Sequence, residues 1–191
     1  MVSSVQLYLG LLALVALERA VELVLSARNA RLARARGAVE RGQGHYPAMA
    51  AFHGLFLVAC GAEVLLLHRP FPGAAGWTAL VVVLGAQALR YWAIATLGWR
   101  WNTRIVVVPG ATPVTSGPYR WVRHPNYVAV IAEMAALPLV HGAWLTTLVF
   151  SLGNGVLLRV RIRAEEEALG EPWRQAFEGR PRFVPGGHGG H

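Results

Sequence analysis

The sequence contains no lysine and no aspartate, because all 18 of its Lys or Arg positions are arginine and all 10 acidic positions are glutamate. Its single cysteine, Cys60, lies inside an apolar run, which excludes a disulfide framework within the chain and a metal site built from several cysteines. There is no Gly-x-Gly-x-x-Gly motif and no alternation of strand and helix patterns, so a soluble Rossmann-type enzyme is not expected. We expect no bound metal ion.

Charge is also scarce, since only 15% of the 191 residues are charged while 54% are hydrophobic, and the mean hydropathy is +0.40. These values lie outside the range of an ordinary soluble domain and indicate a protein that resides in a bilayer. The isoelectric point near 11.0 would also suit a nucleic-acid-binding protein. The arginines lie beside apolar segments instead of forming a soluble basic face, so we expect membrane lipids and no nucleic acid as partners.

A helix needs about 20 apolar residues to cross a hydrocarbon core about 30 Å thick. The mostly apolar stretch 126–160 is too long for one span, and Pro138 followed by His141-Gly142 offers a tight reversal within it. We therefore predict an all-α integral membrane protein with one domain over residues 1–191, a helical hairpin as its last two spans, and a flexible tail over residues 181–191. The predicted spans are about residues 5–25, 48–67, 77–97, 126–141 and 143–163.

Arginines are concentrated in three segments, residues 28–41, 100–123 and 159–182. With five spans all three segments lie on the same side of the membrane, whereas the alternate loops carry only Arg69 or no arginine. The positive-inside rule then places the N-terminus outside and the C-terminus in the cytoplasm.

The segment Ser116–Tyr127, with the sequence SGPYRWVRHPNY, places turn formers, arginines, a histidine and tyrosines directly before the fourth span. Pro125 disfavours helix at the preceding residue, so His124 is predicted to lie at a kink. Upstream, the β-branched run from Ile105 to Val108 predicts a compact loop with extended backbone. The hairpin returns Glu165 and Glu166 to the depth of His124, which predicts one cytoplasmic-side pocket between the two clusters.

This segment, followed after the hairpin by Arg163 and Glu165-Glu166, resembles the signature of the isoprenylcysteine carboxyl methyltransferase family and of the related phospholipid methyltransferases. Leu89-Arg90-Tyr91-Trp92, Leu97-Gly98 and Trp101-Asn102 are similar to what that family carries after its third span. The resemblance covers roughly residues 48–169. It implies an integral membrane enzyme that uses S-adenosylmethionine and releases S-adenosylhomocysteine.

The resemblance also implies a cofactor pocket on the cytoplasmic side and a lipophilic acceptor that enters laterally from the bilayer. Carboxylates suit the hydroxyl and ammonium groups of such a cofactor, and aromatic or imidazole rings suit its adenine and sulfonium. The residues carried over by position as cofactor contacts are Val107, Val108, Gly117, Tyr119, His124, Pro125, Tyr127, Glu165 and Glu166.

Three residues are predicted to act on the acceptor. A carboxylate acceptor needs no base, whereas a phenolic or enolic hydroxyl benefits from one, and His124 or a glutamate can serve. Arg123 or Arg90 can hold an anionic acceptor, although Arg123 also suits a lipid phosphate at the interface. Polar residues within or beside the spans are predicted either to bind the acceptor or to join helices to one another. Those predicted to bind the acceptor are His53, Gln87, Trp101, Asn102 and Glu133.

The segments Arg28-Asn29, Gly37-Ala38-Val39-Glu40 and His45-Tyr46-Pro47, with Asn126, resemble a bacterial subgroup linked to polyketide-derived alkylpyrones and alkylresorcinols. That resemblance implies O-methylation of a long-chain lipid in the bacterial inner membrane.

Other functions stay open at this point. Within the same chemistry they are isoprenylcysteine carboxyl methylation and phospholipid methylation. The Arg-His-Pro-Asn-Tyr block also resembles part of the NADPH-dependent membrane sterol reductases, whose chains are longer and have more spans. A non-enzymatic membrane binding protein or a transporter is a further alternative, although a site facing the cytoplasm differs from the midplane site of a transporter.

Overall fold

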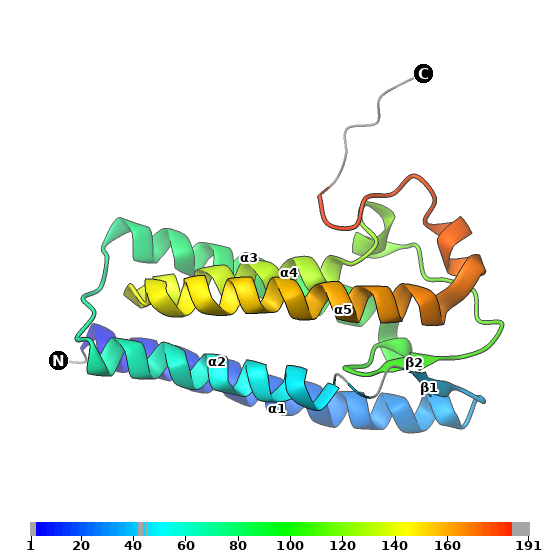
Figure 1. The fold of residues 1–191 in the computed structure, drawn as a ribbon, viewed down its shortest axis with the longest axis horizontal. Helices are drawn as coiled ribbons and strands as arrows, with labels where there is room; N and C mark the ends of the chain where they lie inside the picture. Colours follow the sequence, from blue (N-terminus) through cyan, green and yellow to red (C-terminus); the bar gives the residue numbers. More distant parts are fainter. Residues whose placement is uncertain (1–2, 42–43, 45, 185–191) are drawn as a thin grey trace, which may run out of the picture.

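The computed structural model describes residues 3–41, 44 and 46–184 as a bundle of long helices (Figure 1). A small sheet and short 3-10 helices lie between the long helices. In chain order the elements are α1 (Ser4–Arg34), β1 (Val39–Arg41), α2 (Tyr46–Leu66), α3 (Ala74–Leu97), η2 (Gly98–Arg100), β2 (Ile105–Val107), η3 (Gly117–Arg120), α4 (Pro125–Ala136), η4 (Pro138–His141) and α5 (Trp144–Ala176).

The helices run back and forth along the long axis, so the connections alternate between the two ends of the bundle (Figure 1). The sheet, the segment before α4 and the end of α5 all lie at one end, at the right of Figure 1. The three arginine-rich segments therefore gather at that end, as the sequence predicts. The predicted hairpin is also present. The short helix η4 ends at His141 and is followed by Gly142, whose φ of 72° is left-handed and suits glycine, and α5 then returns beside α4.

Among the described residues, three helices are long and apolar enough to cross a membrane, by length and composition: Tyr46–Leu66, Ala74–Arg100 and Trp144–Ala176. The other two expected spans differ for physical reasons. Helix α1 carries Glu18, Arg19 and Glu22 in one stretch, and α4 has only 12 residues, or about 18 Å of helix. A count of five spans thus stays a prediction.

Helix α5 is longer than the predicted span over residues 143–163. It runs to Ala176, with a break at Gly170, where φ is 71° and ψ is −162°. Glycine tolerates this backbone conformation, and Pro172 cannot continue the regular hydrogen bonding of the preceding turn. The last part of α5 therefore turns at the arginine-rich end of the bundle.

A two-stranded sheet departs from the purely helical prediction. Strand β2 falls in the β-branched run that predicted extended backbone, and it pairs antiparallel with β1, with Val39 opposite Val107 and Arg41 opposite Ile105. Strand β1 was not predicted, because three residues are too few to give an alternating pattern. The pairing ties the connection after α1 to the loop that precedes η3.

The packed core and the outer surface are both apolar. The main core cluster contains residues from each of the helices α1, α2, α3, α4 and α5, and includes Tyr8, Phe56, Met134 and Phe150. On the outside, large apolar side chains are exposed along the helices, as expected for a surface that faces lipid instead of water. Examples are Leu14, Val24, Val58, Val81, Leu84, Val149 and Val156.

A buried carboxylate caps the start of α5. Glu63 on α2 accepts hydrogen bonds from the backbone N–H groups of Leu145 at 3.2 Å and Thr146 at 2.7 Å, and from the Thr146 hydroxyl at 2.7 Å. Its charge is also paired with Arg69, whose Nη2 lies 2.9 Å away. The first amides of a helix have no partner within the helix and attract negative charge, so Glu63 both satisfies them and fixes α5 against α2.

We predict that Glu63→Gln lowers the free energy of unfolding by about 2 kcal/mol, because the neutral amide loses the Arg69 pair and weakens the helix cap. Thermal unfolding in detergent measures the change. Glu171→Gln is the matched control, since Glu171 is an exposed residue whose contacts are with Arg174 and Gln175 on the same helix. Equal unfolding temperatures for the two variants would contradict the predicted role of the cap.

Candidate functional site

The segment Ser116–Tyr127 is anchored to α3 by a close glycine contact. Gly117 has a φ of 56°, and a Cβ atom at this position would lie 2.4 Å from Thr96 Oγ1. Only glycine permits both the backbone conformation and this close approach. Gly117 also begins the short helix η3, in which Pro118 and Tyr119 are buried.

Two clusters that are distant in the sequence meet at the arginine-rich end. His124 Nε2 lies 3.0 Å from Glu166 Oε1, across 42 residues of sequence. One turn further along α4, the Tyr127 hydroxyl donates a hydrogen bond to Glu165. The predicted convergence of the two clusters is therefore observed, because the hairpin brings α5 back past the start of α4.

Arg161 completes the contacts around Tyr127. Its Nε donates to the Tyr127 hydroxyl at 3.1 Å, and its Nη2 donates to the Thr103 carbonyl at 2.9 Å. Arg161 and Glu165 share a helix face at i, i+4 spacing, but Tyr127 lies between them as a bridge. This bridge fixes the phenol ring and connects α4, α5 and the loop before η3.

The segment after α5 closes over the same site. Arg182 donates to both carboxylate oxygens of Glu166, at 3.0 and 2.5 Å, and this hydrogen bonding raises the pKa of Arg182. The backbone N–H groups of Arg123 and His124 donate to the carbonyls of Pro181 at 2.9 Å and Arg182 at 3.2 Å.

These contacts correct the predicted start of the tail. Residue 181 was the predicted first residue of a flexible segment, yet Pro181 and Arg182 are held against the segment before α4 by backbone and side-chain hydrogen bonds. Residues 185–191 of the predicted tail lie outside the described residues.

Aromatic rings form one wall of the site. The His124 ring lies 5.3 Å from that of Tyr127 and 5.4 Å from that of Trp173, and Trp173 in turn contacts Phe177 at 4.8 Å. The break at Gly170 directs Trp173 and Phe177 toward His124. Tyr119 belongs to the same cluster, and burial, followed by the charge of Glu165, raises its pKa, so its phenol stays neutral.

A cavity of about 1170 Å³ runs from this aromatic wall into the helix bundle. At the arginine-rich end it is lined by the loop before η3 and by the start of α4 and end of α5. Within the bundle it is lined by α1, α2 and Arg90 of α3. Its volume exceeds the usual range of about 300–1,000 Å³ for small-molecule pockets, so it has room for two ligands at once.

Most of the predicted site residues line this cavity, and five do not. Gly117 contacts α3, Pro125 begins α4, and Glu166 lies behind His124. Gln87 and Glu133 belong to an ion network described below. The predicted residues on the cavity wall are His53, Arg90, Trp101, Asn102, Val107, Val108, Tyr119, Arg123, His124, Tyr127 and Glu165.

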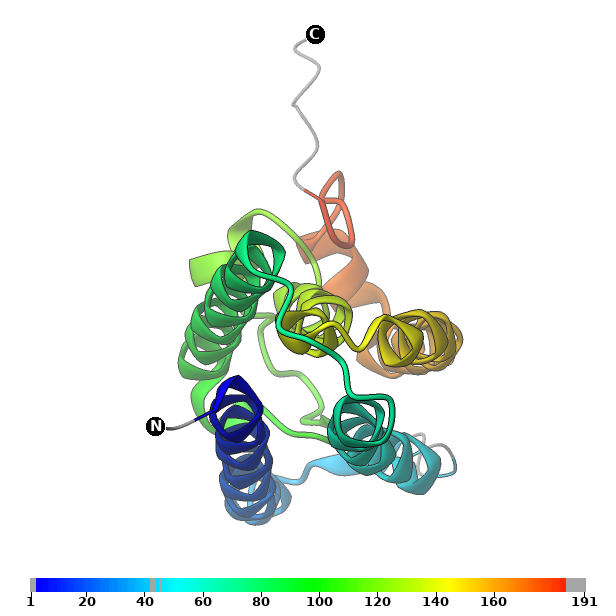
Figure 2. The ribbon, with the colours of Figure 1, turned by 90° about the vertical axis from the view of Figure 1, so that its left-hand side faces the viewer.

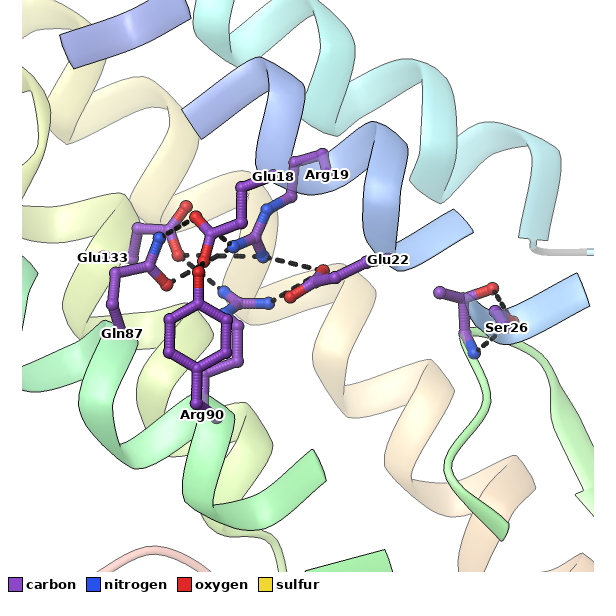
Figure 3. Close-up of polar contacts among 9 residues, drawn as sticks. Glu18, Arg19, Glu22, Ser26, Gln87, Arg90 and Glu133 are labelled. Atoms are coloured by element: carbon purple, nitrogen blue, oxygen red, sulfur yellow. Dashed lines mark hydrogen bonds and ion pairs between the residues drawn. The ribbon is translucent and has the colours of Figure 1, made fainter. Parts of the chain in front are cut away.

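Gln87 and Glu133 were predicted to bind the acceptor, but neither lines the cavity. Glu133 Oε2 accepts a hydrogen bond from Arg90 Nη2 at 2.6 Å and lies 3.9 Å from Arg19 Nη1 (Figure 3). The Gln87 amide donates a hydrogen bond to Glu18 and accepts one from Arg19. Charged groups inside a membrane protein require partners, and these two residues supply them. Their interhelix role is the alternative that the sequence also offered.

Several polar atoms on the cavity wall have no hydrogen-bond partner within the described part of the chain. At the arginine-rich end they are Asn102 Nδ2, Asn126 Oδ1 and Arg161 Nη1. Buried polar atoms without partners are costly, so atoms of this kind mark positions where a ligand restores hydrogen bonds. Across residues 3–41, 44 and 46–184, no group of three or more His, Cys, Asp or Glu side chains is arranged to hold a metal ion.

Sequence reasoning missed three contributors to the site. The sequence shows Arg161 four positions before Glu165, a spacing typical of an ion pair along one helix face, and carries no signal for its contact with Tyr127. Trp173 contacts His124, and this contact depends on the break in α5. Arg182 contacts Glu166, and this contact depends on the chain that follows α5. No local signal at these two positions indicates their partners.

The chain was compared with known proteins. It is 43% identical over 162 residues to the uncharacterized protein YpbQ of Bacillus subtilis, which covers 84% of this chain and 95% of that protein. It is 28% identical over 152 residues to an uncharacterized protein of Haemophilus influenzae, covering 79% and 88% of the two chains. The family model of the isoprenylcysteine carboxyl methyltransferases matches residues 77–171, which contain the two clusters that meet around His124. The chain therefore belongs to the isoprenylcysteine carboxyl methyltransferase family.

Proposed function

We propose that this membrane methyltransferase uses S-adenosylmethionine to methylate an oxygen of a lipophilic acceptor. The observation that carries the proposal is the meeting of His124 and Tyr127 with Glu165 and Glu166 beside one large cavity, in a chain of this family. The acceptor class proposed here is a long-chain lipid with a hydroxyl head, such as a polyketide-derived alkylpyrone or alkylresorcinol.

The residues at the arginine-rich end fit the chemistry of S-adenosylmethionine. Its amino acid part needs a carboxylate for the ammonium group and a cation for the carboxyl group, and Glu165 and Arg161 both line the cavity. Asn102 Nδ2 and Asn126 Oδ1 are a buried donor and a buried acceptor that suit ribose hydroxyls or adenine. Tyr119 and Trp173 offer aromatic faces to a flat base or a sulfonium.

When bound, this cofactor supplies an electrophilic methyl group. The protein's own tasks are to align the acceptor and to exclude water. Tyr127, held by Glu165 and Arg161, fixes the wall next to the bundle. Glu166, held by Arg182, fixes the His124 ring. Both contacts are made directly between side chains of the chain itself.

The topology proposed with this function has five spans, with the N-terminus outside and the C-terminus and cofactor pocket in the cytoplasm of a bacterial inner membrane. The gathering of three arginine-rich segments at one end of the bundle supports it, because arginine is enriched in cytoplasmic segments (Figure 1). The acceptor would then enter the cavity from the bilayer.

We predict that Glu165→Gln weakens binding of S-adenosylhomocysteine at least tenfold, because a carboxylate that accepts charge-assisted hydrogen bonds becomes neutral. Isothermal titration of the purified protein in detergent measures the affinity. Glu167→Gln is the matched control, as Glu167 is exposed two residues further along the same helix, and its affinity should stay within about twofold of wild type. Binding of NADPH in place of S-adenosylhomocysteine would overturn the proposed function.

We also predict that Arg182→Gln lowers the affinity for S-adenosylhomocysteine about tenfold, because Glu166 loses its bidentate partner and no longer orients His124. Arg174→Gln serves as control, since Arg174 lies near the end of α5 and pairs only with exposed Glu171. Unchanged affinity in a folded Arg182→Gln protein would show that the segment after α5 does not position the site.

A further inference from the structure

A second polar region lies at the bundle end of the cavity, away from His124. Glu22 of α1 and Arg90 of α3 are 7% and 6% exposed, and both line the cavity. Among the described residues, Glu22 Oε1 and Arg90 Nε have no hydrogen-bond partner. The two side chains that carry these atoms are neighbours, since Glu22 Oε2 lies 3.8 Å from Arg90 Nη1 (Figure 3).

The charges around this pair limit what can bind there. The ion network contains three carboxylates, Glu18, Glu22 and Glu133, and two guanidinium groups, Arg19 and Arg90 (Figure 3). When all are ionised the network carries one net negative charge. A ligand carboxylate or phosphate would add a second negative charge in a low-dielectric region, where repulsion is strong. A hydroxyl adds no charge, donates to Glu22 and accepts from Arg90.

The cavity reaches the outside of the bundle between α1 and α2. Four of its wall residues are both small and exposed: Ala16 and Ala20 on α1, and Ala50 and Gly54 on α2. A Cβ atom at Gly54 would meet no other atom within 4 Å, so the wall is open at this position. These helices form one side of the bundle in the view along its axis (Figure 2). An alkyl chain can pass here while remaining in contact with lipid.

We propose that Glu22 and Arg90 form the subsite for the acceptor's head group, that this head group is a neutral hydroxyl on an alkyl chain admitted between α1 and α2, and that Glu22 takes its proton. This inference rests on the proposed methyl transfer. The acceptor oxygen gains the methyl carbon and loses its hydrogen, and the electron pair of the broken sulfur–carbon bond stays on sulfur. Glu22 Oε1 holds the released proton.

This assignment also settles which group acts as the base. His124 Nε2 is occupied by Glu166, and Glu166 is in turn held by Arg182, so this ring nitrogen is committed to a structural contact. Glu22 instead has an oxygen without a partner in the described structure, on the wall of the same cavity as Tyr127. A carboxylate in a region closed to water is an effective proton acceptor.

The test uses full-length protein in lipid nanodiscs and two probes, 5-pentadecylresorcinol as the neutral phenol and N-acetyl-S-farnesylcysteine as the carboxylate. With S-adenosylhomocysteine bound, wild-type protein should bind the phenol at least tenfold more tightly. With labelled S-adenosylmethionine it should methylate the phenol. Tighter binding of the carboxylate, or turnover of neither probe, would overturn the inference. Retained binding of S-adenosylhomocysteine in that case would leave the proposed function standing.

A variant of Glu22 and a control distinguish proton transfer to Glu22 from hydrogen bonding to it. Glu22→Gln keeps an oxygen that accepts a hydrogen bond but cannot take a proton, so we expect turnover of the phenol to fall about a hundredfold with little change in KM. Glu167→Gln is the control, since Glu167 is exposed on α5 and does not line the cavity, and its turnover should stay within about threefold of wild type. Wild-type turnover in Glu22→Gln would overturn the role of Glu22.

The access route is tested by substitutions on the outer surface, which do not disturb the buried network. Gly54→Leu should weaken phenol binding at least tenfold and leave S-adenosylhomocysteine affinity unchanged, because leucine fills the opening between α1 and α2. Gly85→Leu is the matched control on the exposed face of α3, where a Cβ atom also meets nothing within 4 Å. Equal phenol affinity in the two variants would overturn the proposed route.

Discussion

The contact between His124 and Glu166 is the interaction on which the rest of the site depends. It joins the start of α4 to the far end of α5, and it is held from behind by Arg182. Without it the cavity would lose the wall that Trp173 and His124 form together. The neighbouring contact of Tyr127 with Glu165 follows from the same alignment of two antiparallel helices, since each residue lies one turn or less from a member of the first pair.

The buried ion network performs a similar function deeper in the bundle. It connects α1, α3 and α4 through Arg19, Arg90 and Glu133 (Figure 3). Such groups are expensive to remove from water, and the network compensates by pairing each of these charges with at least one opposite charge. The network therefore holds α1 and α3 together beside the cavity, which Glu22 and Arg90 line.

Sequence reasoning located the two halves of the site and their meeting, because turn residues, proline positions and the length of an apolar run are local signals. It also gave the extended backbone of β2 from a β-branched run. It did not find the partners of Arg161, Trp173 or Arg182, since these contacts depend on how far α5 continues and where it breaks. It assigned Glu133 to ligand binding, because the sequence does not indicate which arginine pairs with a single carboxylate inside the membrane.

The segment that holds Glu166 follows every helix of the bundle in the chain. During synthesis it leaves the ribosome after α5, so the hairpin must be inserted and folded before Pro181 and Arg182 can hydrogen bond to the backbone at Arg123 and His124. A nascent or truncated chain can therefore have all of its helices in place without a finished site. The pocket is therefore complete only when the segment after α5 has packed against the start of α4.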